Sequence, residues 1–140
     1  MKLFNIVLGS ALVFFIVMFL RCEKVTEITE LTKNTEKIQV VFYNDSIPNT
    51  TLEITDKSEI KKFGKFISDK DTPLYKCSYD GQLIFILSND IANGNKNTIT
   101  MEFNLQPDCT HIAYMYAEGL HTKELSEEGV AYLKRRRNEK

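Results

Sequence analysis

The 140-residue chain lacks an excess of charge of either sign, because 18 basic and 19 acidic side chains leave a net charge of −1. This balance excludes the strongly basic surface of a dedicated nucleic-acid-binding protein. The chain also lacks a phosphate-binding loop, a Gly-x-Ser-x-Gly nucleophile turn, a Cys-x-x-Cys pair and an internal repeat. We therefore expect neither an enzyme nor a bound cofactor.

One segment, residues 3–20, contains no charged side chain at all. As a helix it would span about 27 Å, slightly less than the ~30 Å hydrocarbon core of a bilayer. A helix that is apolar on every face has no side to turn to water, which argues against a surface helix of a soluble domain. We expect residues 1–21 to form a hydrophobic helix that is either a secretory signal peptide or an uncleaved membrane anchor.

Lys2, the apolar run and the Arg21-Cys22 pair that ends it resemble the leader of a bacterial lipoprotein. In that family the cysteine after the leader is lipidated and becomes the first residue of the mature chain. The resemblance implies a lipid on Cys22, although Arg21 stands where the family has a small residue. It concerns only the start of the chain and implies nothing about the domain that follows.

Two patterns disagree about the side of the membrane on which the domain lies. Lys2 precedes the apolar run, whereas Arg21, Lys24, Lys33 and Lys37 follow it, and the positive-inside rule would then leave the domain in the cytoplasm. A leader-like start and the use of cysteine instead suit export. We expect a membrane-anchored domain on the extracytoplasmic side, in the periplasm or at the cell surface, with the cytoplasmic orientation as the alternative.

If Cys22 carries a lipid, Cys77 and Cys109 remain as an even pair, which favours a disulfide in an oxidising compartment. Such a bond needs the two Cα atoms within about 7 Å of each other. The outer two of four strands that pair in sequence order would lie about 14 Å apart. We therefore expect Cys77 on an irregular segment that folds across the end of the sheet.

A metal-binding or thiol protein is the alternative reading of the same residues. Cys109, His111 and His121, with Cys77 or Asp108, offer thiolate, imidazole and carboxylate ligands. Cys109 and His111 would project from the same side of a strand. Their spacing matches no compact zinc pattern, so this site remains the weaker hypothesis.

Beyond the anchor, we expect a polar tether over residues 22–36, which are rich in Thr and Glu, and a single domain over 37–140. Alternating apolar residues predict strands at 38–43 and 51–55 that form a hairpin, and Asp56 caps a helix over 56–68. Further strands are predicted at 74–79, 82–88, 98–105 and 110–116, with a hairpin turn at Asp80-Gly81 and a closing helix that begins after Ser126.

This order, ββαβ(β)ββα, predicts an α+β fold: a mainly antiparallel sheet of about five strands with two helices on one face. A membrane-tethered extracytoplasmic binding or structural module of the cell envelope is the function we expect. An envelope inhibitor or immunity-type protein that blocks a partner enzyme is the alternative. The expected partners are the membrane and a protein, and not a nucleic acid.

Overall fold

The computed structural model of the chain describes residues 27–44, 47–88, 97–116 and 119–139. None of the helices in these ranges is both long enough and apolar enough to cross a bilayer. The expected anchor over 1–21 and the lipid-bearing Cys22 lie outside the described residues. The elements are α2 (Glu27–Asn34), β1 (Thr35–Asn44), β2 (Ile47–Ile54), α3 (Lys57–Phe66), β3 (Ile67–Asp71), β4 (Gly81–Leu87), β5 (Thr98–Asn104), η2 (Pro107–Cys109), β6 (His111–Tyr116), β7 (Gly119–Leu125) and α4 (Glu127–Asn138).

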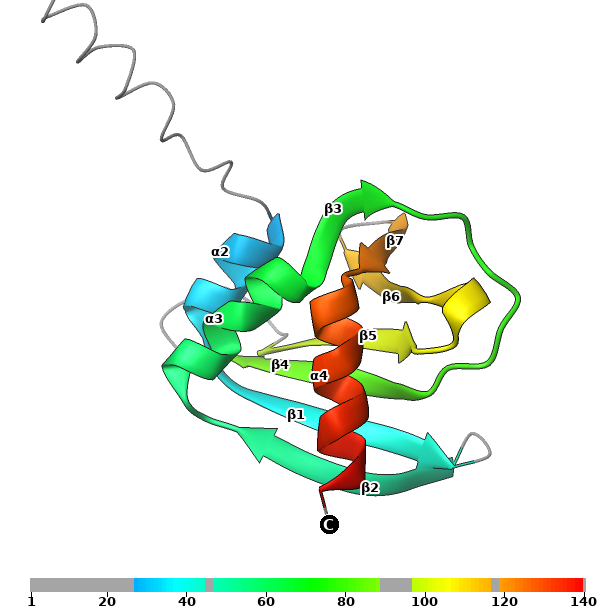
Figure 1. The fold of residues 1–140 in the computed structure, drawn as a ribbon. Helices are drawn as coiled ribbons and strands as arrows, with labels where there is room; N and C mark the ends of the chain where they lie inside the picture. Colours follow the sequence, from blue (N-terminus) through cyan, green and yellow to red (C-terminus); the bar gives the residue numbers. More distant parts are fainter. Residues whose placement is uncertain (1–26, 45–46, 89–96, 117–118, 140) are drawn as a thin grey trace, which may run out of the picture.

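The described strands form one sheet in the order β2-β1-β4-β5-β6-β7-β3, and every pair in it is antiparallel. The three α-helices of the described ranges lie over one face of this sheet (Figure 1). The fold is therefore α+β with an antiparallel sheet, as predicted. The sheet has seven strands rather than about five.

The first hairpin and the helix after it are confirmed. β1 pairs with β2, with Val40 opposite Leu52 and Ile38 opposite Ile54. At the start of α3 the carboxylate of Asp56 accepts a hydrogen bond of 2.8 Å from the backbone N–H of Glu59, which otherwise has no partner within the helix. The helix ends at Phe66, earlier than predicted, because the chain then enters β3.

The predicted tether is wrong from Glu27 onward, because α2 is part of the folded domain. Ile28 and Thr32 of this helix are buried, and the helix packs against α3. Gly64 of α3 faces this helix, and a Cβ there would lie 3.3 Å from the Thr32 hydroxyl oxygen. The helical spacing of Ile28 and Leu31 marks the buried face, and tertiary packing outweighs the low helix propensity of the threonines.

The predicted strand over 74–79 and the hairpin turn at Asp80-Gly81 are also wrong. Residues 72–79 have no regular structure, and Gly81 is the first residue of β4. A Cβ on Gly81 would meet the Val41 carbonyl oxygen and lie 2.6 Å from Phe103 Cζ, so glycine serves close packing here rather than a turn. The two additional strands are β3 and β7, which pair with each other at one side of the sheet.

The hydrophobic core lies between the helices and the inner face of the sheet. Phe63 of α3 makes edge-to-face contacts with Phe66, Phe85 and Tyr132, at ring-centroid distances of 5.2–6.2 Å. Leu83 and Phe85 of β4 are fully buried, whereas Ile84 and Ile86 on the other face are only half-buried, so the run 83–87 is not buried on both faces as its apolar sequence suggests.

Candidate functional site

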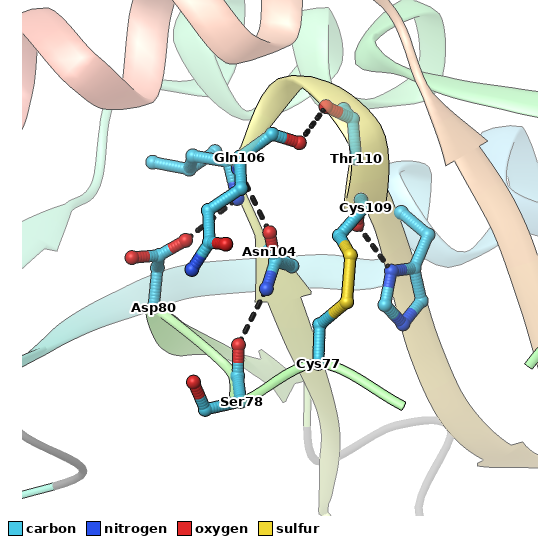
Figure 2. The surroundings of a disulfide bond; sticks show 9 residues. Cys77, Ser78, Asp80, Asn104, Gln106, Cys109 and Thr110 are labelled. Carbon is cyan, nitrogen blue, oxygen red and sulfur yellow. Dashed lines mark hydrogen bonds between the residues drawn. A yellow bond between two sulfur atoms is a disulfide. The ribbon is translucent and has the colours of Figure 1, made fainter. Parts of the chain in front are cut away.

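A disulfide joins Cys77 to Cys109, whose Cα atoms lie 6.4 Å apart (Figure 2). Cys77 belongs to the irregular segment 72–80, which we call the strap, and Cys109 ends the short helix η2. The prediction that Cys77 lies on an irregular segment is thus confirmed, and the bond closes a loop across 32 positions of sequence. The bond holds the middle of the strap against the β5–β6 connection.

The strap is also fixed at both of its ends. At its start, Thr72 and Thr122 of β7 exchange two hydrogen bonds: the Thr72 N–H donates to the Thr122 carbonyl over 3.1 Å, and the Thr122 hydroxyl donates to the Thr72 carbonyl over 2.5 Å. Near its end, the Asn104 side-chain amide donates to the Ser78 carbonyl (Figure 2). The strap is therefore attached to the rest of the domain at three separate points along its length.

His111 lies under the strap and is fully buried. Its ring stands 5.2 Å from the ring of Tyr75 and 5.7 Å from that of Tyr79, centroid to centroid. Its Nδ1 atom is 2.6 Å from the Cys109 carbonyl oxygen, and because a carbonyl only accepts, Nδ1 carries the hydrogen. Nε2 has no hydrogen-bond partner in the described part of the chain. His111 thus packs as an aromatic support for the strap.

The structure does not bring the candidate metal ligands together. The sulfur of Cys109 is bonded to Cys77, and His121 stands on the opposite sheet face from His111, with its ring stacked 5.5 Å from that of Tyr114. In the four described ranges, no three His, Cys, Asp or Glu side chains gather where they could hold a metal ion. Cys109, His111 and His121 consequently have separate structural positions.

A groove of about 680 Å³ lies between the strap, η2, the end of β7 and α4. One wall is a single face of α4, with Glu127, Val130, Ala131 and Lys134 at helical spacing. The remaining lining residues come from the strap and β3, from the β5–η2 segment and from β7: Lys70, Asp71, Thr72, Pro73, Tyr75, Leu105, Pro107, Asp108, Thr110, Glu124 and Leu125. Apolar side chains from all these segments therefore meet charged ones at one concave surface.

Two ion pairs stand at the strap side of the groove. The Lys70 ammonium lies 2.9 Å from the Glu124 carboxylate, and that of Lys123 lies 2.5 Å from the Asp71 carboxylate. The hydrogen bond from Lys123 and its positive charge lower the pKa of Asp71, so this carboxyl is ionised at neutral pH. Each of these two ion pairs is neutral as a whole. The net charge of the groove is therefore set by its other charged side chains.

The charges along α4 differ from these pairs. Glu127 and Lys134, and Asp108 across the groove, form no ion pair with any other described residue. Glu127 and Lys134 are two helical turns apart, about 10 Å along the axis, with Val130 and Ala131 between them. The groove thus offers an apolar middle with an unpaired anion toward one end of the helix and an unpaired cation toward the other.

The sequence predicts the disulfide but not the groove. Its walls come from segments more than 50 positions apart, from Lys70 to Lys134, and no local pattern marks such a surface. The only local indication is the helical spacing of Glu127, Val130, Ala131 and Lys134 on α4. Comparison of the chain with protein-family models, with curated proteins and with solved structures gives no match.

Proposed function

We propose that the chain is a membrane-tethered, extracytoplasmic binding module that holds a peptide segment of a partner protein in the groove beside α4. The groove carries this proposal, because a concave surface with apolar lining and a few convergent charges is the usual form of a binding site. One of its walls is the strap, which the disulfide fixes, so the site exists before a ligand arrives.

A short extended peptide fits the dimensions and the charges of this groove. The distance of about 10 Å between Glu127 and Lys134 equals the length of roughly three residues of extended chain. An apolar side chain would occupy the middle, over Val130 and Ala131. A basic group of the peptide would then approach Glu127, and an acidic group would approach Lys134.

The disulfide and the leader-like start of the chain both support the proposed extracytoplasmic location. A structural disulfide persists in oxidising compartments and is rare in the cytosol. The charge-free run 3–20 and the Cys22 that follows it would supply the tether, as lipid or as helix. The mass of the mature protein isolated from membranes tests this part: a diacylglyceryl adduct that begins at Cys22 or an intact Met1 supports a tether, whereas a free chain cleaved elsewhere contradicts it.

The binding site is tested by photocrosslinking of the full chain in the membranes of the cells that make it. A photoreactive side chain replaces Ala131, which lines the groove, and in a matched variant it replaces Glu128, which is exposed on the same helix but does not line the groove. We expect adducts of defined mass from position 131 and not from position 128. Equal labelling at both positions would contradict a groove-specific partner.

The same experiment separates a general binding module from an envelope inhibitor or immunity-type protein. A dedicated inhibitor should give one adduct that contains a single stoichiometric enzyme partner, and that enzyme should regain activity when Ala131 is replaced by a bulky residue. Several adducts of different mass would favour the general module.

A further inference from the structure

Basic side chains are concentrated on two helices, α3 and α4. These helices carry eight basic and three acidic side chains, whereas the rest of the described chain carries five basic and twelve acidic ones. The near-neutral total therefore conceals a domain with one positive side and a negative remainder. Such a separation of charge creates a potential that acts on charged partners at a distance.

The two helices lie side by side over the same face of the sheet (Figure 1). They run in opposite directions, because Gly129 near the start of α4 packs on Phe66 at the end of α3. Toward the other end of the pair, the Arg136 guanidinium lies 3.5 Å from the carboxylate of Glu59 in the first turn of α3. The outward sides of α3 and α4 therefore form one continuous surface.

Three lysines of α3 supply most of the free charge on this surface. Lys61, Lys62 and Lys65 are exposed, and none of them forms an ion pair with a described residue. Gly64 faces α2 and Glu59 faces α4, so the helical spacing directs Lys61 and Lys65 away from the sheet. Side chains three and four positions apart are neighbours on a helix, and these like charges repel one another. An anionic partner would relieve this repulsion.

The acidic groups of α3 are already engaged and leave these lysines unneutralised. The Glu59 carboxylate accepts a hydrogen bond of 2.5 Å from the Tyr132 hydroxyl, besides its contact with Arg136. The Asp56 carboxylate caps the helix by accepting a hydrogen bond from the Glu59 N–H, although the positive charge of Lys62 also lowers its pKa. Both carboxylates thus serve the packing and the capping of the helix.

Two arginines extend the positive surface onto α4. The guanidinium carbons of Arg135 and Arg136 lie 5.5 Å and 5.8 Å from the centroid of the Tyr132 ring, which itself packs against α3. Glu139 lies 3.9 Å and 2.7 Å from the two guanidinium groups and offsets part of their charge. We use the name basic face for the exposed cations of both helices on this side, Lys61, Lys62, Lys65, Arg135 and Arg136.

The basic face and the groove use different sides of α4. Val130 and Lys134 line the groove, whereas Tyr132 and Arg136 point toward α3. A surface that covers the basic face would therefore leave the groove open to a peptide. Glu128, which is exposed at the start of α4, would be repelled by an anionic surface, so the contact would centre on α3.

The basic face lacks the apolar centre that a protein interface normally has. The large apolar side chains that are exposed in the described part of the chain are Leu74, Met115, Tyr116 and Leu120, and none of them belongs to α3 or α4. Long lysine side chains can instead follow mobile phosphate groups, as they do where basic segments bind anionic lipid. The chemistry of the face thus favours a layer of anionic head groups over an acidic protein.

Chain length places the basic face within reach of a membrane to which the chain is tethered. Cys22 precedes Glu27, the first residue of α2, by five positions, which span at most about 18 Å. For an uncleaved anchor, Leu20 precedes it by seven positions, about 25 Å. Because α2 packs against α3, the chain enters the domain through the helix layer that carries the basic face.

We propose that the basic face docks on anionic phospholipid head groups and so orients the domain on its tether. This inference rests on the proposed membrane tether. The helix layer would then face the bilayer, the opposite face of the sheet would face away from it, and the groove would open to the side.

Lysine labelling tests this orientation directly. The full chain is reconstituted in vesicles of phosphatidylcholine, with or without phosphatidylglycerol, and acetylated with a reagent that does not cross bilayers. Peptide mapping by mass spectrometry gives the rate at each lysine, with Lys76, exposed on the strap, as the reference. We expect Lys61, Lys62 and Lys65 to react several-fold more slowly in the anionic vesicles relative to Lys76, and high salt to abolish the difference because it screens the charges.

Two matched variants keep Lys62 as the reporter and change only its neighbours. Lys61→Gln with Lys65→Gln removes two charges, whereas Lys61→Arg with Lys65→Arg keeps them, and both positions are exposed, so each variant should fold. We expect the protection of Lys62 in anionic vesicles to be lost in the first variant and retained in the second. Protection that persists in the glutamine variant, or that is equal in neutral vesicles, would contradict docking on anionic lipid.

Flotation of the same samples distinguishes a failure of this inference from a failure of the tether. If the chain floats with both kinds of vesicle and the lysines of α3 are not protected, the docking is wrong while the tether stands, and the basic face then faces water or an acidic protein. If the chain floats with anionic vesicles alone, the tether is wrong and the basic face binds lipid by itself. If it floats with neither, both are wrong.

Discussion

The carboxylate of Asp80 lies 3.4 Å from the guanidinium of Arg137, which joins the end of the strap to the last turn of α4. The same guanidinium donates a hydrogen bond of 3.0 Å to the Tyr43 carbonyl at the end of β1. The other carboxylate oxygen of Asp80 accepts a hydrogen bond of 2.8 Å from the backbone N–H of Leu105. Asp80 therefore connects the strap, β5 and α4, although its place before a glycine suggests only a turn.

We expect Asp80→Ala to destabilise the domain by about 1–3 kcal/mol, because it leaves the buried N–H of Leu105 without its acceptor. Asp80→Asn should cost less, since its side chain keeps one acceptor oxygen. Urea unfolding followed by circular dichroism measures both changes. Asp108→Ala is the control, because Asp108 is exposed and makes no described hydrogen bond; a loss there as large as in Asp80→Ala would contradict this role.

Asp80 and its neighbour also show where inference from the sequence succeeds and where it stops. Helix α3 follows from local information, namely the Asp56 cap and the spacing of Ile60, Phe63 and Phe66. The Asp80-Gly81 dipeptide carries a strong local signal for a turn, but packing against Phe103 decides the outcome. Local sequence patterns thus predict an element such as α3, whose own residues determine its structure. They fail at a position such as Gly81, where packing against a strand distant in the sequence determines the backbone conformation.

The sequence does not reveal β3 and β7, the two strands at one edge of the sheet, for a related reason. β7, with the sequence GLHTKEL, has half-buried residues at most positions and only Leu125 is fully buried, so no alternation reveals it. It forms because β6 and β3 supply partners on both sides. The groove depends on this same β3–β7 pair and on α4, which explains why the sequence indicates its disulfide but not its walls.

Gly81 should be intolerant of any side chain. Gly81→Ala places a Cβ against the Val41 carbonyl and within 2.6 Å of Phe103 Cζ, so β1, β4 and β5 must separate, at a cost of about 1–3 kcal/mol or more. Gly64→Ala is the informative contrast, because the tightest contact of its Cβ is the Thr32 hydroxyl oxygen at 3.3 Å, the two Thr29 atoms lie at an ordinary 3.7 Å, and alanine favours the helix. We expect a much lower melting temperature for the first variant and a change near zero for the second. Similar losses in both variants would show that the close contacts with Val41 and Phe103 are not what makes position 81 sensitive.

Reduction of the Cys77–Cys109 bond should destabilise the domain by about 3–4 kcal/mol, since the bond closes a long loop in the unfolded chain. The matched variant Cys77→Ser with Cys109→Ser should show the same loss and should not respond to reductant. Urea midpoints with and without dithiothreitol give both values. A wild-type midpoint that does not depend on reductant would mean that the hydrogen bonds at Thr72 and Asn104 suffice to hold the strap.

The two buried tyrosines should make the domain sensitive to alkali. Burial, followed by hydrogen bonding to Glu59 and the negative charge of that residue, raises the pKa of Tyr132 well above its ordinary value of 10, and burial with the charge of Glu27 does the same for Tyr114. Their hydroxyls remain protonated in the folded state at a pH at which the unfolded chain ionises. Their contribution to stability is therefore complete below pH 10 and is lost as the pH rises from there through the raised folded values.

The variant Tyr132→Phe measures how much of this loss of stability at high pH comes from Tyr132. At neutral pH we expect it to cost about 1 kcal/mol, because it removes the 2.5 Å hydrogen bond to the Glu59 carboxylate. Above pH 10 the variant should lose less stability with rising pH than the wild type, because one ionisation is missing from its unfolded state. Tyr116→Phe, at the exposed end of β6, should retain the full alkaline loss because both buried tyrosines remain. Urea unfolding at a series of pH values provides the comparison, and parallel curves for Tyr132→Phe and the wild type above pH 10 would show that Tyr132 ionises as freely in the folded domain as in the unfolded chain.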